Sequence, residues 1–187
     1  MINHQLPSKP LLLFFIFSII FACQEDSLNE EINLTVLELD QADADMIAAS
    51  NLANEYLSSS SARESKEKSI TILRFKKGKL FFNTNTDNIQ GYHEVTEATV
   101  TAIVAPGEYL FWYSGSGISD LDGIEFDAAS QQQLSNYPEE INSDKMWVIA
   151  VPENVSDNTI LKYDIIYQFK GNSGSAIRLD PKIKINN

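Results

Sequence analysis

The sequence predicts a mainly β protein: an antiparallel β-sandwich preceded by a short helix and a tether. Short apolar or alternating segments recur over residues 69–187, and turns containing Gly, Pro or Asn separate them. The same region shows little helical patterning, and 43% of the chain is apolar, as in ordinary globular proteins. A series of short strands with turn signals between them is typical of a sandwich.

Residues 1–22 are predicted to be a signal peptide that is cleaved from the mature protein. Lys9 precedes an apolar run in which Ser18 is the one polar residue, "LLLFFIFSIIFA". A helix that spans a bilayer needs about 20 apolar residues. The run is therefore too short for a membrane span and has the length expected of a secretory signal.

The apolar run ends in "IFAC", residues 20–23, and at this point the chain resembles bacterial lipoprotein precursors. The resemblance implies cleavage before Cys23, diacylation of its sulfur and acylation of its new amino group. Phe21 is bulkier than the residue usual at its place, and a plain secretory peptide is the alternative. Cys23 is the only cysteine, so the domain has no internal disulfide. Two or more acyl chains would anchor it stably in a membrane.

The residues that follow Cys23, "QEDSLNEE", are acidic. They resemble the export signal of lipoproteins that Bacteroidota-type bacteria send to the cell surface. The resemblance implies an outer-membrane protein that faces the outside of the cell. A periplasm-facing position is the alternative, in which the acidic run is only a solvated tether.

Residues 23–68 are predicted to form a tether, a helix and a linker. Gln24 to Ala62 contains acidic residues and no Lys or Arg, so an anionic membrane surface would repel this segment. Met46, Ala49 and Ala53 recur at helical spacing, which predicts a helix over about 42–57. The polar stretch "SSSSARESKEKS" then indicates a boundary near residue 68.

Residues 69–187 contain the predicted strands. Gly78 can supply a tight hairpin after the first strand, and Pro181 interrupts the last strand as at an edge or a bulge. A polar crossover over 127–145, with a helical turn near 128–134, is a place where binding often resides. The expected strands cover 69–75, 79–82, 99–105, 108–115, 146–151, 162–169 and 176–185.

The strand "EYLFWYSG", residues 108–115, has aromatic side chains on both of its faces. Tyr109, Phe111 and Tyr113 point one way, and Leu110 and Trp112 point the other way. Burial in a core is the default interpretation, because burying an aromatic side chain stabilises by roughly 1.5–3 kcal/mol. The second face is then covered by the predicted helix, the crossover or a partner chain, or it presents aromatics to a ligand.

The stretch "VAPGEYLFWYSGSGISDLDGIEF" resembles the Pro-Gly turn and Trp-bearing central strand of cupredoxin-like and immunoglobulin-like sandwiches. The resemblance covers about residues 69–187. A copper site of the cupredoxin type needs two His and a Cys thiolate. The mature chain has one His, His93, and one Cys, the acylated Cys23, so no copper cofactor is expected.

Calcium is a second cofactor that we considered. Oxygen-bearing side chains follow one another at the spacing of an EF-hand-like loop, at Asn83, Asn85, Asp87 and Glu94. The first ligand is Asn instead of Asp, and Asn88 stands where the loop needs Gly. The alternative is that these residues simply form turns.

We expect a non-catalytic binding or interaction module. The charge of −12 argues against nucleic acid, and Ser114 stands where the hydrolase motif G-x-S-x-G needs its first glycine. The ligand is a glycan or a protein, and the partner of the anchor is a membrane. The alternative is a structural adaptor of an envelope complex. A calcium-stabilised module and a hydrolase are less favoured than these two functions. The candidate ligand-binding residues are Trp112, Tyr113, Ser116, Asp120 and Asp122.

Overall fold

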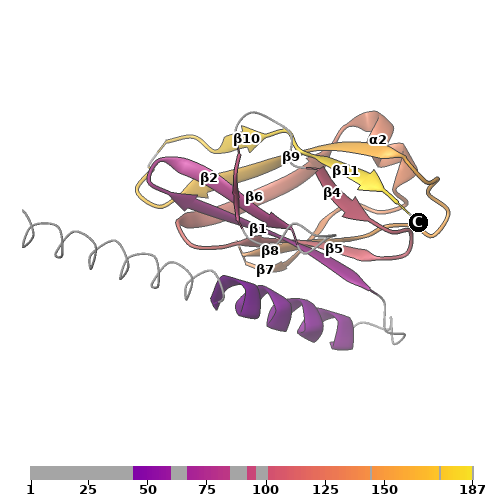
Figure 1. Ribbon diagram of the computed structural model, residues 1–187, viewed down its shortest axis with the longest axis horizontal. Coiled ribbons are helices and arrows are strands. Elements are labelled where there is room, and N and C mark those ends of the chain that lie inside the picture. The colour runs from indigo at the N-terminus through magenta and orange to yellow at the C-terminus, as the bar shows by residue number, and fades with distance from the viewer. Residues whose placement is uncertain are drawn as a thin grey trace, which may run out of the picture. The chain divides into compact units, whose positions relative to one another are not determined.

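The structure is a computed structural model, and it describes residues 44–59, 67–84, 92–95, 101–143, 145–172 and 174–186. Strands in two sheets make up most of this part of the chain, and a helix over residues 44–59 precedes them (Figure 1). The predicted mainly β sandwich with an N-terminal helix is confirmed. The tether and the signal segment lie outside the described residues.

The first sheet has six strands in the order β3-β2-β1-β5-β8-β7. The β1–β2 hairpin turns at Lys77 and Gly78, whose φ angles are 49° and 78°, so Gly78 has the predicted role. The central strand β5 is the aromatic strand. The bounds are β1 (Lys68–Lys76), β2 (Lys79–Thr84), β3 (His93–Glu94), β5 (Tyr109–Ser114), β7 (Glu139–Asn142) and β8 (Met146–Ala150).

The second sheet is built around the long strand β9, which pairs with β6 on one side and with β10 and β11 on the other. β10 and β11 continue one ladder along β9 and are separated at Pro181, as predicted for a residue without an N–H. The bounds are β4 (Thr101–Val104), β6 (Ile118–Phe126), β9 (Ile160–Phe169), β10 (Ile177–Leu179) and β11 (Lys182–Ile185).

The two sheets enclose the sandwich core. Leu110 and Trp112 of β5 pack there against Tyr163 and Ile165 of β9, and all four are buried. β9 alternates between buried and more exposed residues from Ile160 to Tyr167, and its last two residues are both partly buried. This is the period-2 pattern that the sequence shows over 162–169, and it identifies the outer face of the second sheet as solvated.

The helix over residues 44–59 covers the other face of the first sheet. Ala49 and Ala53 are completely buried in a second cluster with Ile70, Phe111 and Met146, which we call the helix-side core. Small side chains on the helix let its backbone approach the sheet closely. The compact unit runs from Ala42 to Asn187. The sandwich and the helix are therefore one unit, although the polar linker separates them in the sequence.

Three features of the sheets differ from the sequence-based expectation. β1 pairs with β5 in parallel, and β4 pairs with β11 in parallel, so the sandwich is not antiparallel throughout. β7 lies inside the predicted crossover, which also contains the expected helical turn as α2 (Ala128–Gln133). β6 occupies residues that were expected to form a loop. Register shifts after Ile118 and Leu121 interrupt its alternation of buried and exposed residues, which hides the strand in the sequence.

Candidate functional site

Trp112 lies in the sandwich core and not on a surface. It is completely buried, and its Nε1 donates a hydrogen bond to the Tyr163 hydroxyl across the two sheets at 3.2 Å. Burial raises the pKa of Tyr163, which keeps this hydroxyl protonated and neutral. The prediction that Trp112 contacts a ligand is therefore wrong. Trp112 joins the two sheets in the core, which agrees with the default interpretation of the aromatic strand.

Tyr113 points to the opposite face of β5 and is half-buried in the helix-side core. Burial raises the pKa of Tyr113, and the charge of Asp45 on the helix raises it further. Trp112 and Tyr113 thus serve two separate cores. The cover of the second face, which the sequence left open, is the helix of the same chain.

The turn "SGSG", residues 114–117, holds β5 against β1. Gly115 donates its N–H to the Leu73 carbonyl at 2.8 Å, and the Ser116 carbonyl accepts from the Phe75 N–H at 2.9 Å. A Cβ on Gly117, which has a φ of +81°, would lie 1.9 Å from the Phe75 carbonyl oxygen. Backbone therefore occupies the space beside Gly117, and the turn has a structural role.

Ser116 also receives the helix. The Asp45 carboxylate accepts hydrogen bonds from the Ser116 N–H at 2.9 Å and from its hydroxyl at 2.7 Å. The same Oδ2 lies 3.1 Å from Nε of Arg74, whose guanidinium stands 4.5 Å from the centre of the Tyr92 ring. Asp45 is only 7% exposed. We call this group of bonds the Asp45 contact, and it fixes the start of the helix on the first sheet.

Asp120 and Asp122 lie on strand β6 and not in a loop, which corrects their predicted place. Asp122 is exposed, and both of its carboxylate oxygens accept from Nε2 of Gln168 on β9, at 3.1 and 3.4 Å. Asp120 is partly buried on the same strand. The five predicted ligand-binding residues thus divide among the sandwich core, the helix-side core, the turn and the second sheet.

The two ends of the predicted calcium loop lie in β-strands. Asn83 lies within β2 opposite Ile72, and Glu94 lies in β3 with its carboxylate 2.8 Å from Nζ of Lys79. Asn85 and Asp87 lie outside the described residues. Within the described ranges, no group of three or more His, Cys, Asp or Glu side chains is placed to hold a metal ion.

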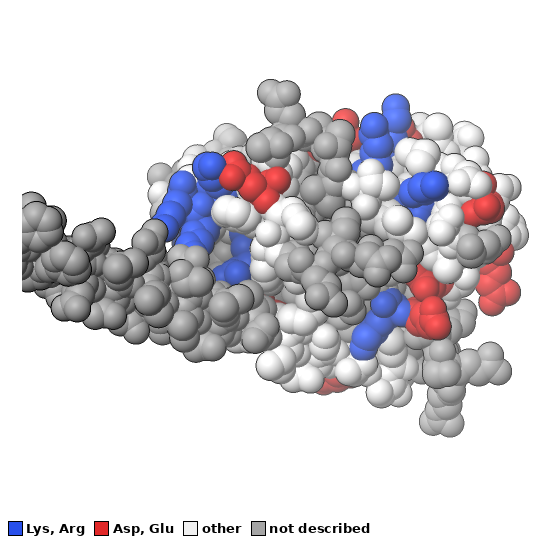
Figure 2. All heavy atoms as spheres, in the orientation of Figure 1, with Lys and Arg blue, Asp and Glu red and all other residues white. Residues whose placement is uncertain are grey.

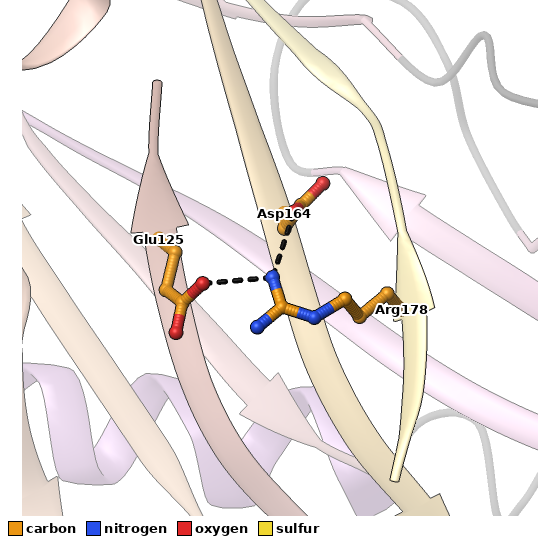
Figure 3. Close-up of polar contacts among 3 residues, drawn as sticks. All are labelled: Glu125, Asp164 and Arg178. Atoms are coloured by element: carbon orange, nitrogen blue, oxygen red, sulfur yellow. Dashed lines mark hydrogen bonds and ion pairs between the residues drawn. The ribbon is translucent and has the colours of Figure 1, made fainter. Parts of the chain in front are cut away.

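The outer face of the second sheet carries an ion-pair network. Arg178 of β10 reaches across β9, and its Nη1 lies 2.9 Å from Asp164 and 2.7 Å from Glu125 of β6 (Figure 3). Hydrogen bonds to these two carboxylates raise the pKa of Arg178. The side chains are well exposed, so water and salt screen the attraction. The network aligns neighbouring strands and leaves the face polar.

Tyr137 is the most exposed of the large hydrophobic side chains in the described part of the chain, at 76%. It lies in the crossover between α2 and β7, two residues before Glu139. The Tyr56 hydroxyl near the end of the helix donates to Glu139 at 3.3 Å, and its ring lies 6.3 Å from that of Tyr109. Sequence reasoning pointed to this crossover by its length and polarity, but not to Tyr137.

No family model and no curated protein matches the chain. Among solved structures, it is similar to the crystal structure of a cysteine protease inhibitor from Entamoeba histolytica, with 12% identity and a TM-score of 0.31. The match covers 63% of this chain and 95% of that chain. The fold assignment therefore depends on the strand pairing and the two cores. In the ranges that the structure describes, no helix is long and apolar enough to cross a membrane.

Proposed function

We propose that the chain is the precursor of a bacterial outer-membrane lipoprotein, anchored through acyl groups on Cys23, whose sandwich is a non-catalytic binding or interaction module. The observation that carries the anchor is the position of Cys23. It is the only cysteine of the chain, and it ends the apolar run in "IFAC". The acidic residues that follow support the cell-surface orientation.

The architecture of the unit supports a binding module. The helix and the two sheets form one compact unit, and the helix starts at the Asp45 contact beside the turn between β1 and β2. α2, which starts the crossover, lies at the opposite end of the sandwich (Figure 1). The α2 end of the unit therefore lies away from the point where the helix begins.

Tyr137 is the residue that we assign to ligand contact. An exposed aromatic ring offers an apolar face on which a sugar ring or a side chain of a partner stacks. Glu139 and Glu140 follow it in β7 and are exposed as acceptors of hydrogen bonds from hydroxyl or N–H groups. A glycan or a protein with exposed donors fits this chemistry.

The anchor is tested by expressing the wild-type precursor and Cys23→Ser in the presence of an alkyne fatty acid. The wild type should incorporate the label, shift to the size expected after cleavage before residue 23, and remain with the membrane. Cys23→Ser should lose all three properties. If Cys23→Ser is still processed, labelled and membrane-bound, the anchor assignment is wrong.

The binding role is tested by melting the wild type and Tyr137→Ala with a panel of soluble glycans. A ligand that binds the folded state adds about 2.7 kcal/mol to the free energy of unfolding when its concentration is one hundred times its Kd. The melting temperature rises as a result. The shift should occur in the wild type and be lost in Tyr137→Ala, while Tyr137→Phe keeps most of it. A stable complex that survives mild detergent extraction, without any glycan response, would instead favour the structural adaptor.

A further inference from the structure

Several lysines of the described unit are concentrated at one of its ends. Lysines gather in the turns at the end where β1 meets β2, and Figure 2 shows Lys and Arg side chains clustered there, on its left side. The turn of the hairpin contributes a run of them, and the turns before β8 and after β9 contribute more. We call this surface the basic end, and it consists of Lys76, Lys77, Lys79, Lys145 and Lys170.

The hydrogen bonds show that these turns lie side by side. The Ser114 N–H donates to the Lys145 carbonyl, and the Lys170 N–H donates to the Gly117 carbonyl, both at 2.8 Å. Gly117 in turn contacts the backbone of Phe75, one residue before Lys76. Phe75 also stacks on Phe169, with ring centres 4.0 Å apart. Turns from both sheets therefore form one surface.

Acidic residues at the basic end are largely engaged with bases or amides. Asp45 is bound to Arg74 and Ser116, Glu94 to Lys79, and Asp122 to Gln168. Asp120 lies nearby and is partly buried. Lys77 and Lys170 are exposed. Among the described residues of this surface, the Lys and Arg side chains outnumber the Asp and Glu side chains, although the chain as a whole carries −12.

The opposite end of the unit carries more acidic than basic side chains. Its turns and strand ends carry Glu67, Glu108, Glu153 and Asp157, together with Lys68 and Lys184. The two ends thus differ in charge along the strand direction. A negatively charged surface would attract the first end and repel the second.

The described chain also begins at the basic end. Residue 45 is bound to Ser116, so the N-terminal segment that leads back to Cys23 leaves the unit there. About 20 residues separate Cys23 from the helix, and such a chain reaches at most roughly 70 Å. That reach allows either end of the unit to face the bilayer. An anionic bilayer repels the acidic residues between Gln24 and Asp43, so any attraction must come from the lysines of the unit and not from the tether.

We propose that the basic end is a docking surface for the anionic lipid headgroups of the membrane that holds the anchor. The proposal depends on the lipid anchor proposed above. Lysine side chains bind phosphate groups as point charges, and each one adds to attraction near an anionic surface. Docking at this end directs α2 and Tyr137 away from the membrane, where a ligand can reach them.

The experiment uses the full acylated protein in nanodiscs of neutral phosphatidylcholine or of phosphatidylcholine mixed with phosphatidylglycerol. Cys23 is blocked by its lipid, so one introduced cysteine can be labelled with a fluorophore. Ser119→Cys places the label on exposed β6 beside the basic end, and Asn154→Cys places it on the exposed turn at the acidic end. Lipids with a nitroxide on the headgroup quench a label that lies close to them.

The label at 119 should be quenched in anionic nanodiscs and much less in neutral ones, and the label at 154 in neither. At 1 M salt, where charges are screened beyond about 3 Å, the quenching at 119 should fall to the neutral level. The double variant Lys77→Glu with Lys170→Glu should have the same effect as salt. Lys162→Glu with Lys182→Glu removes the same charge from the outer face of the second sheet and should leave the quenching unchanged.

Equal quenching of the two labels, or quenching at 119 that ignores lipid charge, would overturn the docking surface. Failure of the anchor is distinguished by co-elution with the nanodiscs. If the protein co-elutes with both kinds of nanodisc but the label at 119 is quenched equally in both, the anchor is retained and the docking surface is refuted. Protein that co-elutes with neither refutes both. Co-elution with anionic nanodiscs alone would support the basic end and refute the acyl anchor.

Discussion

Gly117 and Gly78 show that two glycines with almost the same backbone angle have different constraints. Both have a positive φ, +81° and +78°, which disfavours any residue with a Cβ. Gly78 has nothing within 4 Å of its absent Cβ, whereas Gly117 faces the Phe75 backbone. A flexible side chain could move aside, but a strand backbone that belongs to the core cannot.

Gly117→Ala should therefore destabilise the protein far more than Gly78→Ala. We expect a loss of roughly 3–5 kcal/mol in the free energy of unfolding for Gly117→Ala, from the left-handed backbone and the steric conflict together. Gly78→Ala should lose only about 1–2 kcal/mol, since the backbone conformation alone is strained. Urea unfolding of both variants measures the difference, and equal losses would contradict the close contact of Gly117 with Phe75.

Glu108 is the residue through which pH should act on stability. Burial raises its pKa, the N–H of Ala105 opposes this, and neighbouring Glu67 raises the pKa again. A raised pKa means that the folded state holds the proton more tightly than the unfolded state. The stability linked to Glu108 is thus full below the ordinary glutamate pKa and is lost as pH rises through the raised value.

Glu108→Gln should raise the melting temperature at neutral pH, because it removes a partly buried charge and keeps an oxygen for the Ala105 N–H. The advantage should shrink as pH falls through the raised pKa, where Glu108 itself becomes protonated. Glu153→Gln, at an exposed position of the same end, is the matched control for removal of one surface charge. A gain for Glu108→Gln that stays constant down to pH 3 would disprove the linkage.

At the scale of elements, the helix over residues 44–59 is held at its start by charge and along its length by apolar contact. Asp45 bonds to Arg74 and Ser116, and the buried alanines contact the first sheet. These contacts come from residues far apart in the sequence. The predicted helical period identifies the buried face, but it does not identify the sheet that this face covers.

Asp45→Asn should loosen the start of the helix. The substitution removes the charge that faces Arg74 and leaves a partly buried guanidinium with a weaker partner, at a cost of about 1–3 kcal/mol. Amide hydrogen exchange should accelerate over the first turns of the helix more than over β5. Glu55→Gln, on the exposed side of the same helix, should change neither quantity. Uniform acceleration across the whole unit would show that the contact is not local.

At the scale of the whole molecule, the helix is a layer of the fold and not an appendage. Removing it would expose the helix-side core, including Ile70, Ile72, Phe111, Met146 and Val148, all of which are buried. Contiguous apolar surface of this kind drives association of chains. The compact unit accordingly begins at Ala42, before the helix.

A chain that begins at residue 61 should therefore self-associate or bind a hydrophobic dye, while a chain that begins at residue 42 should remain monomeric and unfold cooperatively. Size-exclusion chromatography with light scattering, together with dye fluorescence, compares the two. A monomeric, dye-negative chain from residue 61 would mean that the sheet does not need this cover.

Sequence reasoning recovered most elements of the fold where residue pattern alone decides structure. Alternation along most of β9, the positive φ at Gly78 and the interruption at Pro181 are local properties, and each is observed as predicted. β6 was missed because its register shifts break the alternation. The parallel pairs were missed because strand pairing brings together segments distant in the chain.

The candidate site was less predictable than the fold. Trp112, Ser116 and Asp120 are close in the sequence, yet neighbours on a strand point to opposite faces and a turn separates two sheets. Tyr137 has no sequence signal beyond its place in a polar crossover. Exposure depends on what other segments cover, which one segment cannot show.

The sequence by itself determined the class of fold, the positions of most strands, the helical period near the N-terminus and the pattern "IFAC" from which we infer the anchor. These depend on side-chain period, turn residues and short motifs. Only the tertiary structure decided that the helix covers the aromatic strand, that Trp112 is internal, that "SGSG" receives Asp45 and that lysines from separate turns form one basic end. Each of these depends on contacts between distant segments, and packing of the whole chain sets those contacts.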